Sequence, residues 1–458
     1  MFGEIKRIHF VGIGGIGMSG IAEVLNSMGY SITGSDLKES SVTKYLKDLG
    51  IKITIGHSKK NVYNADVLVY SSAVRPDNVE ILEARRRKIP VIPRAEMLAE
   101  LMRMKFSIAI AGSHGKTTTT SMVGQILLEC GADPTIIVGG KLRIIGTNAR
   151  LGKGKYLVAE ADESDRTFLK LFPTISIITS IDEEHLDRYI DIKDIKNAFI
   201  DFANRVPFFG TVYLCYEDKN AIFIRNLIEK RVVTYGLSLE ADIKGLELKR
   251  DGFYYSFLFQ GNGTKFGRVK LNVPGIHNVL NAVAAIGVGL ELGFSFDKVK
   301  NAIEHFEGVI RRFEIKAKTE EFLIVDDYAH HPREIESVLK TAREGWKGRI
   351  IAIFQPHLFS RTILLKDRFG KAFFDADLVY ITDIYPSREE RIPGITGKII
   401  SDAIKGYGHK NVRYIENMDD IYKELADELK PGDMIITMGA GNINRVGEKI
   451  ADYVKNKR

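Results

Sequence analysis

The 458-residue chain has only two cysteines, Cys130 and Cys215, and a single tryptophan. Two cysteines are too few for a disulfide framework, which excludes a small disulfide-stabilised secreted protein and indicates a reducing compartment. The longest apolar stretches are shorter than a membrane span and are interrupted by glycine or charge, which argues against membrane insertion. Glu4, Lys6 and Arg7 lead directly into an apolar strand pattern, unlike a signal peptide. We therefore expect a cytoplasmic protein.

The chain also lacks a concentrated basic region. The net charge is +7, but the basic residues are scattered except for the run 85–88, which we expect on one solvated helix face. Aromatic residues do not interleave with the basic ones, so we expect no nucleic-acid partner. An excess of positive charge suits polyanionic small substrates equally well.

The composition and the repeated strand–helix alternation indicate an α/β protein. With 45% hydrophobic and 27% charged residues, the chain is typical of a globular protein, and its length allows about three domains. Alternating strands and helices predict parallel sheets. We predict a Rossmann-like domain at residues 1–103, a central phosphate-loop domain at 104–310 and a second Rossmann-like domain at 311–458. In the central domain, residues 252–273 predict a small antiparallel sheet around a Gly-Asn-Gly turn at 261–263.

The most informative motif is Ala-Gly-Ser-His-Gly-Lys-Thr-Thr-Thr at residues 111–119. It lies between a buried strand pattern and a helix pattern, which is the arrangement of a phosphate-binding loop. Gly112 and Gly115 would allow the backbone to turn so that its N–H groups point at phosphate oxygens. Lys116 would supply a positive charge to the β- and γ-phosphates, and the hydroxyl of Thr117 a ligand for magnesium. The motif predicts an ATP-using enzyme.

A second glycine-rich turn, Gly-Ile-Gly-Gly-Ile-Gly, occupies residues 12–17 after the first strand pattern. Asp36 follows 19 residues after Gly17, at the end of the next strand pattern, which matches the dinucleotide-fold fingerprint. Many proteins that bind nucleotide diphosphates share this turn. A nicotinamide-dependent oxidoreductase therefore remains an alternative, although it leaves the phosphate loop unexplained.

Acidic residues follow two strand patterns of the central segment. The run 160–165 contains four acids at the end of a strand, where they would be suitable magnesium ligands in a domain with a phosphate loop. A solvated acidic turn is the alternative. His185 follows another strand among acids and could bind a second metal ion, or could be a structural histidine.

Polar residues at three further places also point to ligand contacts. Asn278 and Asn281 lie three residues apart near a helix start, so both would face one side and could meet a purine edge, although a helix N-cap would explain Asn278 alone. Two acids and two histidines at 326–332 follow a buried strand of the third segment, where packing does not explain them. His357 and Arg361 follow the next strand, and an arginine there could hold a carboxylate.

Ten motifs, spread in order from residue 12 to residue 443, together resemble one family, the Mur ligases of peptidoglycan synthesis. They are GIGGIGMSGIAEVL, GSHGKTTTT, EADESD, DEEHLD, HNVLNA, RRFE, DDYAHHP, FQPHLFSR, DIYPSREERIPG and MGAGNI. Within the family the chain is most similar to members that add L-alanine. The resemblance implies a UDP-sugar domain, a central ATPase domain and an amino-acid domain. The implied reaction joins L-alanine to the lactyl carboxylate of UDP-N-acetylmuramate through an acyl phosphate, with ADP and phosphate as the other products.

The resemblance also implies roles for individual residues. Catalysis would fall to Lys116, His185, Asp327 and His330. ATP would contact Gly112, Ser113, His114, Gly115, Lys116, Thr117, Thr118, Asn278, Asn281, Arg312 and Asp327. The UDP-sugar would contact Gly14, Gly15, Gly17, Asp36, Ser71 and Ser72. The amino acid would lie among Tyr328, His330, His357 and Arg361. The metal ligands would be Thr117, Glu160 and His185.

The implied cofactors are ATP and two magnesium ions, with manganese able to replace them. UDP-N-acetylmuramate and L-alanine are the implied partners, and both a monomer and a homodimer remain open. Two features depart from the family pattern: Leu358 stands where many relatives have arginine, so carboxylate recognition would depend on Arg361, and residues 197–201 contain no lysine that could be carbamylated. A related ligase that attaches a recycled tripeptide to the same UDP-sugar remains an alternative, although it typically lacks the Gln-Pro-His sequence found at 355–357.

Overall fold

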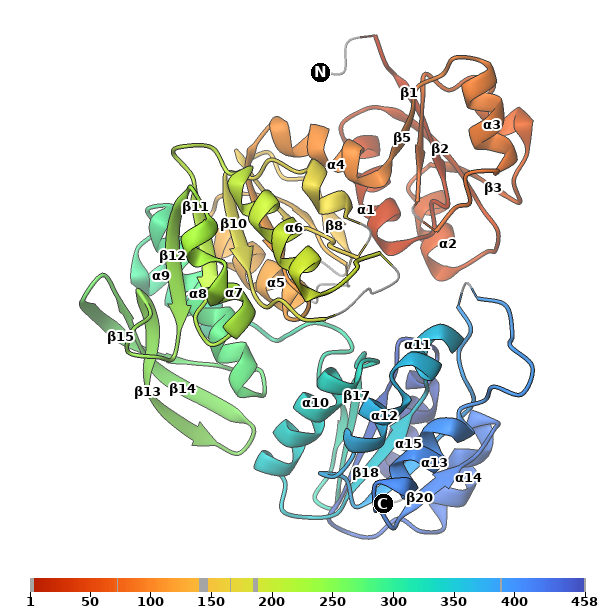
Figure 1. Ribbon diagram of the computed structural model, residues 1–458, viewed down its shortest axis with the longest axis vertical. Helices are drawn as coiled ribbons and strands as arrows, with labels where there is room; N and C mark the ends of the chain where they lie inside the picture. Colours follow the sequence, from red (N-terminus) through yellow and green to blue (C-terminus); the bar gives the residue numbers. More distant parts are fainter. Residues whose placement is uncertain are drawn as a thin grey trace. The chain divides into compact units, whose positions relative to one another are not determined.

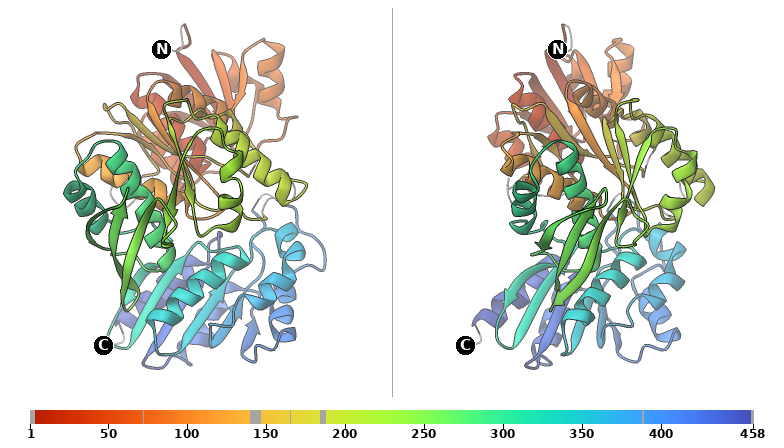
Figure 2. Two further views of the ribbon diagram at one scale, coloured as in Figure 1. Left: turned by 60° about the vertical axis from the view of Figure 1, so that its left-hand side comes forward. Right: turned by 90° about the vertical axis from the view of Figure 1, so that its left-hand side faces the viewer.

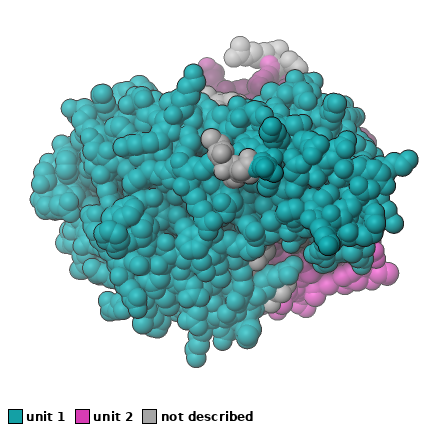
Figure 3. Space-filling view, turned by 90° about the horizontal axis from the view of Figure 1, so that it is seen from above, with its two compact units in different colours: residues 1–248, 256–272, 277–309 teal, residues 249–255, 273–276, 310–458 magenta. Residues whose placement is uncertain are grey.

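The computed structural model describes residues 4–71, 73–139, 147–164, 166–183, 188–387 and 389–456. The chain forms two compact units, which Figure 3 colours separately. The first unit comprises residues 1–248, 256–272 and 277–309, and the second comprises residues 249–255, 273–276 and 310–458. Within the described residues, three sheets of five, ten and six strands give the chain the expected three-part α/β architecture. Among the described helices, none has both the length and the hydropathy needed to cross a bilayer.

The five-stranded sheet is entirely parallel, as the alternating pattern predicts, and has the order β3-β2-β1-β4-β5. Its strands are β1 (Arg7–Val11), β2 (Ser31–Asp36), β3 (Lys52–Ile55), β4 (Val67–Tyr70) and β5 (Val91–Pro93). The helices of this part are α1 (Ile16–Ser27), α2 (Ser41–Asp48), the 3-10 helix η1 (Lys59–Val62), α3 (Val79–Arg86) and α4 (Arg94–Arg103). The strand order reverses between β1 and β4, and a ligand crevice forms at such a switch point in open parallel sheets.

Both faces of this sheet are covered, because alternate residues of each strand point to opposite sides. Ile8 and Phe10 of β1 pack into one apolar cluster with residues of α1, α2 and α4. Val11 of β1 and Leu68 of β4 pack into a second cluster with Ile81 of α3. The sheet is therefore buried between two layers of helices, in agreement with the predicted Rossmann-like arrangement.

A buried carboxylate, Glu80 of α3, lies against β1 and β2. It accepts hydrogen bonds from Ser35 Oγ at 2.6 Å, Asn61 Nδ2 at 2.6 Å and the Ser58 N–H at 3.0 Å. His9 Nε2 of β1 lies 3.3 Å from the same carboxylate, whose side chain is fully buried. Burial raises the pKa of Glu80, but these hydrogen bonds outweigh burial and lower the pKa to about 2. Glu80 thus connects α3 to β1, β2 and η1.

The lowered pKa of Glu80 predicts an acid-dependent loss of stability. The ionised carboxylate stabilises the fold above its ordinary pKa of 4.5, and this stabilisation is lost as the pH falls from 4.5 toward the folded value of about 2. We expect Glu80→Gln to lower the free energy of unfolding at pH 7 by on the order of 3 kcal/mol, with a smaller difference at pH 3. Urea unfolding of both proteins at the two pH values measures this difference in the free energy of unfolding. Glu39→Gln, at an exposed ion pair with Lys47, is the control and should change little.

The ten-stranded sheet has the order β15-β14-β13-β12-β11-β10-β6-β9-β7-β8. Its strands are β6 (Phe106–Ala111), β7 (Thr135–Ile137), β8 (Ala149–Arg150), β9 (Tyr156–Glu160), β10 (Ile175–Ile178), β11 (Thr211–Cys215), β12 (Arg231–Gly236), β13 (Ile243–Asp251), β14 (Tyr254–Gly261) and β15 (Thr264–Lys270). The helices are α5 (Lys116–Glu129), η2 (Thr167–Lys170), α6 (Ile192–Asn204), α7 (Lys219–Phe223), η3 (Arg225–Leu227), α8 (Ile276–Glu291) and α9 (Phe296–Glu304).

The pairing within this sheet matches the predicted mixture of parallel and antiparallel strands. Strand β6 lies between β9 and β10 and is parallel to both. Strands β14 and β15 are antiparallel and join at the predicted turn, where Asn262 and Gly263 have positive φ. They extend the main sheet, because β13 pairs with β12. The short antiparallel pair β7–β8 was not predicted, since two- and three-residue strands leave too little periodicity in the sequence.

The six-stranded sheet has the order β16-β17-β21-β18-β19-β20. Its strands are β16 (Glu314–Lys318), β17 (Phe322–Asp327), β18 (Ile350–Phe354), β19 (Leu378–Ile381), β20 (Val412–Tyr414) and β21 (Asp433–Met438). The helices are α10 (Pro332–Gly345), α11 (Phe359–Leu364), α12 (Lys366–Lys371), α13 (Lys398–Gly406), α14 (Met418–Ala426) and α15 (Asn444–Asn456). Helices lie on both faces of this sheet (Figures 1 and 2).

Alternation along the central strands accounts for the two helical layers. Leu323 and Val325 of β17 pack with α10, α12 and α13, whereas Phe322 and Ile324 pack with α14 and α15. Strand β16 is an antiparallel edge strand that the sequence did not predict. It is rich in charged residues, as edge strands often are, and this hides the strand pattern.

Candidate functional site

The predicted phosphate loop connects β6 to α5. Gly112 and Gly115 have φ values of +132° and +80°, in the left-handed region that favours glycine. A Cβ atom at Gly112 would lie 2.1 Å from Oγ1 of Thr179, so no larger residue fits there. The N–H of His114 donates to Oγ of Ser180 at 3.0 Å. The turn therefore requires glycine at both ends and is attached to the segment that follows β10.

The side chain of Lys116 is held at the mouth of this loop. Its Nζ donates to Oε1 of Glu163 at 2.8 Å and to the carbonyl of Gly112 at 2.5 Å. The Glu163 side chain is only 3% exposed. Burial raises the pKa of Glu163, although the Lys116 ammonium opposes the rise. The sequence did not single out Glu163 within the acidic run, because spacing alone does not show which acid of a turn faces the loop.

Glu160 has the environment expected of a cation ligand. It ends β9 directly opposite Ile110 of β6, so its carboxylate lies at the strand edge where the phosphate loop begins. Its Oε1 atom is buried and has no hydrogen-bond partner among the described residues. A buried carboxylate oxygen without a partner is costly unless a cation or water completes it. Glu160, with the hydroxyl of Thr117 in the first turn of α5, is therefore a donor set that fits magnesium.

Two predicted site residues, Ser72 and His185, lie outside the described residues. Within the part of the chain that is described, no group of three or more His, Cys, Asp or Glu side chains could hold a metal ion. The predicted ligand set for the second ion, which depends on His185, therefore stays a prediction.

Asn278 and Asn281 lie together on α8. Nδ2 of Asn281 donates to Oδ1 of Asn278 at 3.0 Å, as expected for residues three apart on one helix face. Because α8 begins at Ile276, Asn278 is inside the first turn and the alternative of an N-cap does not apply. A Cβ atom at Gly115 would lie 2.9 Å from Oδ1 of Asn281. Asn281 therefore lies directly against the phosphate loop, and Asn278 is hydrogen-bonded to it.

The first glycine-rich turn lies at the switch point between β1 and β4. Its N–H groups are partly used within the protein: Gly12 and Ile13 donate to the carbonyl of Ser35 at 2.9 and 3.1 Å, and Gly14 donates to Oδ2 of Asp36 at 2.8 Å. Ser71 follows β4, and a Cβ atom at Gly12 would lie 3.2 Å from Cβ of Ser71. Asp36 and Ser71 thus flank the turn, as the sequence predicts for one binding region.

Asp327 organises the turn after β17 in the second unit. Its carboxylate accepts the N–H groups of Phe313 and Ala329, both at 2.7 Å. Burial raises the pKa of Asp327 to about 6, although Arg312 opposes the rise. The guanidinium of Arg312 lies over the ring of Tyr328, 5.6 Å from its centroid. Asp327 therefore holds the backbone that carries both Arg312 and Tyr328.

His330 is neutral and has a defined tautomer. Burial and the nearby Arg361 lower its pKa to about 3, although Glu334 opposes this shift. Nδ1 of His330 lies 3.0 Å from the carbonyl of Tyr328, which can only accept, so Nδ1 carries the proton. Nε2 of the neutral ring is then a hydrogen-bond acceptor.

Three more side chains gather around His330. The His357 ring lies 5.7 Å from the His330 ring, and Nη1 of Arg361 lies 3.4 Å from Nδ1 of His357. Tyr385 stacks on His357 with a centroid distance of 6.0 Å, and its carbonyl accepts the N–H of Leu358. Leu358 has φ +70°, unusual for a leucine, and its side chain is buried. The sequence missed Tyr385, although it lies in the run DIYPSREERIPG; its contact with His357 is long-range.

The predicted site residues fall into two groups, one in each unit. The first unit contains the UDP-sugar set and most of the ATP set: Gly14, Gly15, Gly17, Asp36, Ser71, Gly112, Ser113, His114, Gly115, Lys116, Thr117, Thr118, Glu160, Asn278 and Asn281. The second unit contains Arg312, Asp327, Tyr328, His330, His357 and Arg361. Arg312 and Asp327, predicted to contact ATP, are therefore grouped with the amino-acid set.

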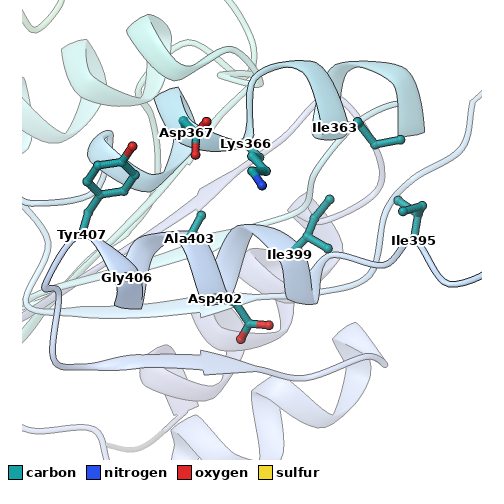
Figure 4. A pocket seen from close by; sticks show the side chains of 9 residues that line it. All are labelled: Ile363, Lys366, Asp367, Ile395, Ile399, Asp402, Ala403, Gly406 and Tyr407. Atoms are coloured by element: carbon teal, nitrogen blue, oxygen red, sulfur yellow. The ribbon is translucent and has the colours of Figure 1, made fainter.

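A cavity of about 670 Å³ lies in the second unit between α11, α12 and α13 (Figure 4). Ile363, Ile395 and Ile399 gather at one end of it, and Asp367 and Tyr407 lie at the other. The nine described residues that line it include none of the predicted site residues. This cavity therefore does not correspond to the predicted amino-acid site.

Three protein-family models match successive parts of the chain. The model of the Mur ligase family catalytic domain matches residues 7–106, that of the Mur ligase middle domain residues 110–289, and that of the Mur ligase glutamate ligase domain residues 311–441. The UDP-N-acetylmuramate–L-alanine ligase of Geotalea uraniireducens (strain Rf4) is 53% identical over 455 residues, covering 99% of each chain. The chain belongs to the Mur ligase family.

Further relatives agree with this assignment over the full length of this Mur ligase. The UDP-N-acetylmuramate–L-alanine ligase of Geotalea daltonii is 51% identical over 455 residues and 99% of each chain. The crystal structure of UDP-N-acetylmuramate–alanine ligase MurC from Thermotoga maritima superposes with a TM-score of 0.83 at 33% identity, covering 99% of this chain and all of that one. The chain is therefore an ATP-dependent ligase with the fold of this structure, and ATP and magnesium are the cofactors of the family.

Proposed function

We propose that this Mur ligase joins L-alanine to the lactyl carboxylate of UDP-N-acetylmuramate, with conversion of ATP to ADP and phosphate, as the first amino-acid addition to the peptidoglycan precursor. The observation that carries this proposal is the identity of about half of all residues, over the full length, to relatives named for this reaction. Residues 1–103 would hold the UDP-sugar, residues 104–310 the ATP and residues 311–458 the amino acid.

The phosphate loop would perform the first chemical step. A carboxylate is a poor electrophile, so the lactyl carboxylate oxygen attacks the γ-phosphorus, the bond to the β-phosphate oxygen breaks, and an acyl phosphate and ADP form. Lys116 stabilises the charge that spreads over the transferring phosphoryl group. Magnesium, held by Thr117 and Glu160, would neutralise phosphate charge during this step. Before ATP binds, Glu163 holds Lys116 at the loop, so the lysine is already positioned.

The second step would take place beside His330. The alanine amine attacks the acyl carbon, and the tetrahedral intermediate loses phosphate as its C–O bond breaks. The amine must be in its neutral form to attack, and Nε2 of the neutral His330 would accept a hydrogen bond from it and orient it toward the acyl carbon. Arg361, 3.4 Å from His357, would hold the alanine carboxylate. Asn281, which lies against the phosphate loop, and Asn278, which is hydrogen-bonded to it, would contact the adenine.

Several finer points belong to the same proposal. Two magnesium ions would act, one at Thr117 and Glu160 and one at His185, and manganese would be able to substitute for them. The protein would act in the cytoplasm as a monomer or homodimer, without a nucleic-acid partner. The tripeptide-adding ligase is the second candidate, because it uses the same UDP-sugar.

Phosphate release tests the proposed function. We expect release from ATP and magnesium only when both UDP-N-acetylmuramate and L-alanine are present, together with the product mass of UDP-N-acetylmuramoyl-L-alanine. Release that requires the tripeptide in place of alanine would establish the second candidate. Turnover of a nicotinamide cofactor without ATP would contradict both.

A further inference from the structure

A cavity of about 280 Å³ in the first unit is lined on two sides by cationic side chains. Arg94, the first residue of α4, and Arg188 line it, together with Tyr70 at the end of β4 and Thr167 at the start of η2. The described lining residues include no aspartate or glutamate. A cavity with two guanidinium groups and no carboxylate in its lining suits an anionic ligand.

Arg94 extends from this cavity onto the first glycine-rich turn. A Cβ atom added at Gly17 would lie 2.5 Å from Nη1 and 3.2 Å from Cζ of Arg94. The missing side chain at Gly17 therefore allows the guanidinium to lie against the first turn of α1. A helix N-terminus also favours negative charge. Arg94 and the start of α1 thus favour an anion at the same place, next to the switch point of the sheet.

The other edge of Arg94 is bound to the acidic segment after β9. Nη2 of Arg94 donates to Oδ2 of Asp162 at 3.1 Å, and Oδ1 of Asp162 accepts the N–H of Ser164 at 3.1 Å. The residue after Asp162, Glu163, holds Nζ of Lys116. A short chain of contacts therefore leads from the cavity to the lysine of the phosphate loop.

We propose that Arg94 is a positioning residue shared by the diphosphate of the sugar nucleotide and Asp162, so that a bound UDP-sugar orders the acidic segment beside the phosphate loop. The planar guanidinium can donate from two edges at once, one to the diphosphate and one to Asp162, whereas a lysine ammonium cannot reproduce this fork. This inference rests on the proposed function, because it takes UDP-N-acetylmuramate as the ligand. The diphosphate is favoured over the lactyl carboxylate because the guanidinium lies on Gly17 of the glycine-rich turn.

Titration calorimetry of the full chain with UDP, UDP-N-acetylglucosamine and UDP-N-acetylmuramate tests the first part. We expect Arg94→Gln to weaken all three by about 10- to 100-fold, and Arg94→Lys to weaken them by less. Arg103→Gln, at the other end of α4 in an exposed pair with Glu100, is the matched control and should leave all three unchanged. Unchanged UDP affinity in Arg94→Gln would overturn the assignment. If binding is weakened for UDP-N-acetylmuramate alone, Arg94 contacts the lactyl carboxylate, and its assignment to the diphosphate is overturned.

Asp162→Asn tests the second part without removing the cation. We expect this variant to bind UDP within about twofold of wild type but to lose the effect of UDP on the dissociation constant of a non-hydrolysable ATP analogue. The dissociation constant of the ATP analogue is measured with and without UDP, and the ratio of the two values is compared between proteins. If Asp162→Asn gives the same ratio as the wild type, the proposed coupling is overturned. Both experiments measure binding alone. A negative result in them is therefore distinguishable from a failure of the proposed function, which would appear as the absence of alanine-dependent phosphate release in the wild type.

Discussion

Lys116→Ala should lower phosphate release from ATP by roughly 10³-fold or more, because the substitution removes the cation that stabilises the transferring phosphoryl group. The affinity for UDP-N-acetylmuramate should stay within about twofold of wild type, because the glycine-rich turn and Arg94 lie on other elements of the first unit. Phosphate release at saturating substrates and calorimetric binding of the UDP-sugar measure the two effects separately. A parallel loss of UDP-sugar binding would contradict the assignment of these two sites to different domains.

The design of this experiment must account for Glu163. Removing Lys116 leaves the buried carboxylate of Glu163 without the ammonium 2.8 Å away, which lowers stability in addition to catalysis. Thermal unfolding of Lys116→Ala, and of the double variant with Glu163→Gln, separates the two consequences. We expect the double variant to recover stability but not phosphate release. Lys153→Ala, at an exposed lysine of the same unit, should leave both unchanged.

His330→Ala should lower kcat/KM for L-alanine by about 10²-fold, since it removes the hydrogen-bond acceptor that would orient the attacking amine. The KM values for ATP and the UDP-sugar should change little. His305→Ala, at an exposed histidine that directly follows α9, should leave all three parameters unchanged. Initial rates with each substrate varied in turn provide the measurement. An equal rise in the KM values for alanine, ATP and the UDP-sugar would instead indicate a general disturbance of the fold.

The pH dependence of the wild type gives an independent check on His330. Its pKa, lowered to about 3, predicts that the ring stays neutral throughout pH 5 to 9. The profile of kcat/KM for alanine in that range should therefore contain no step from His330. A fall in kcat/KM below about pH 6.5 that disappears in His330→Ala would contradict the lowered pKa of His330, because it would show that the ring titrates at its ordinary value.

The local motifs that the sequence predicts are those whose geometry depends on a few neighbouring residues. The phosphate loop, with glycine at both ends and lysine opening α5, has the predicted turn because only glycine tolerates φ values of +132° and +80° at Gly112 and Gly115. The parallel order of the first sheet likewise follows from alternating strands and helices. The antiparallel edge strand β16 escaped prediction, because its charged residues obscure its periodicity.

The contacts that position the candidate site could not be predicted from the sequence, because they join residues that are distant along the chain. Glu163 meets Lys116 across 47 positions, Arg94 meets Asp162 across 68, and Tyr385 stacks on His357 from a separate loop. No periodicity or spacing encodes such pairs, because they form only when separate parts of the chain fold against one another. The sequence by itself determined the α/β class, the two glycine-rich turns and the chemical types of the site residues, since these depend on local backbone conformation and side-chain chemistry. Only the tertiary structure decided which acid holds Lys116, which arginine lies on the first glycine-rich turn and which nitrogen of His330 carries the proton.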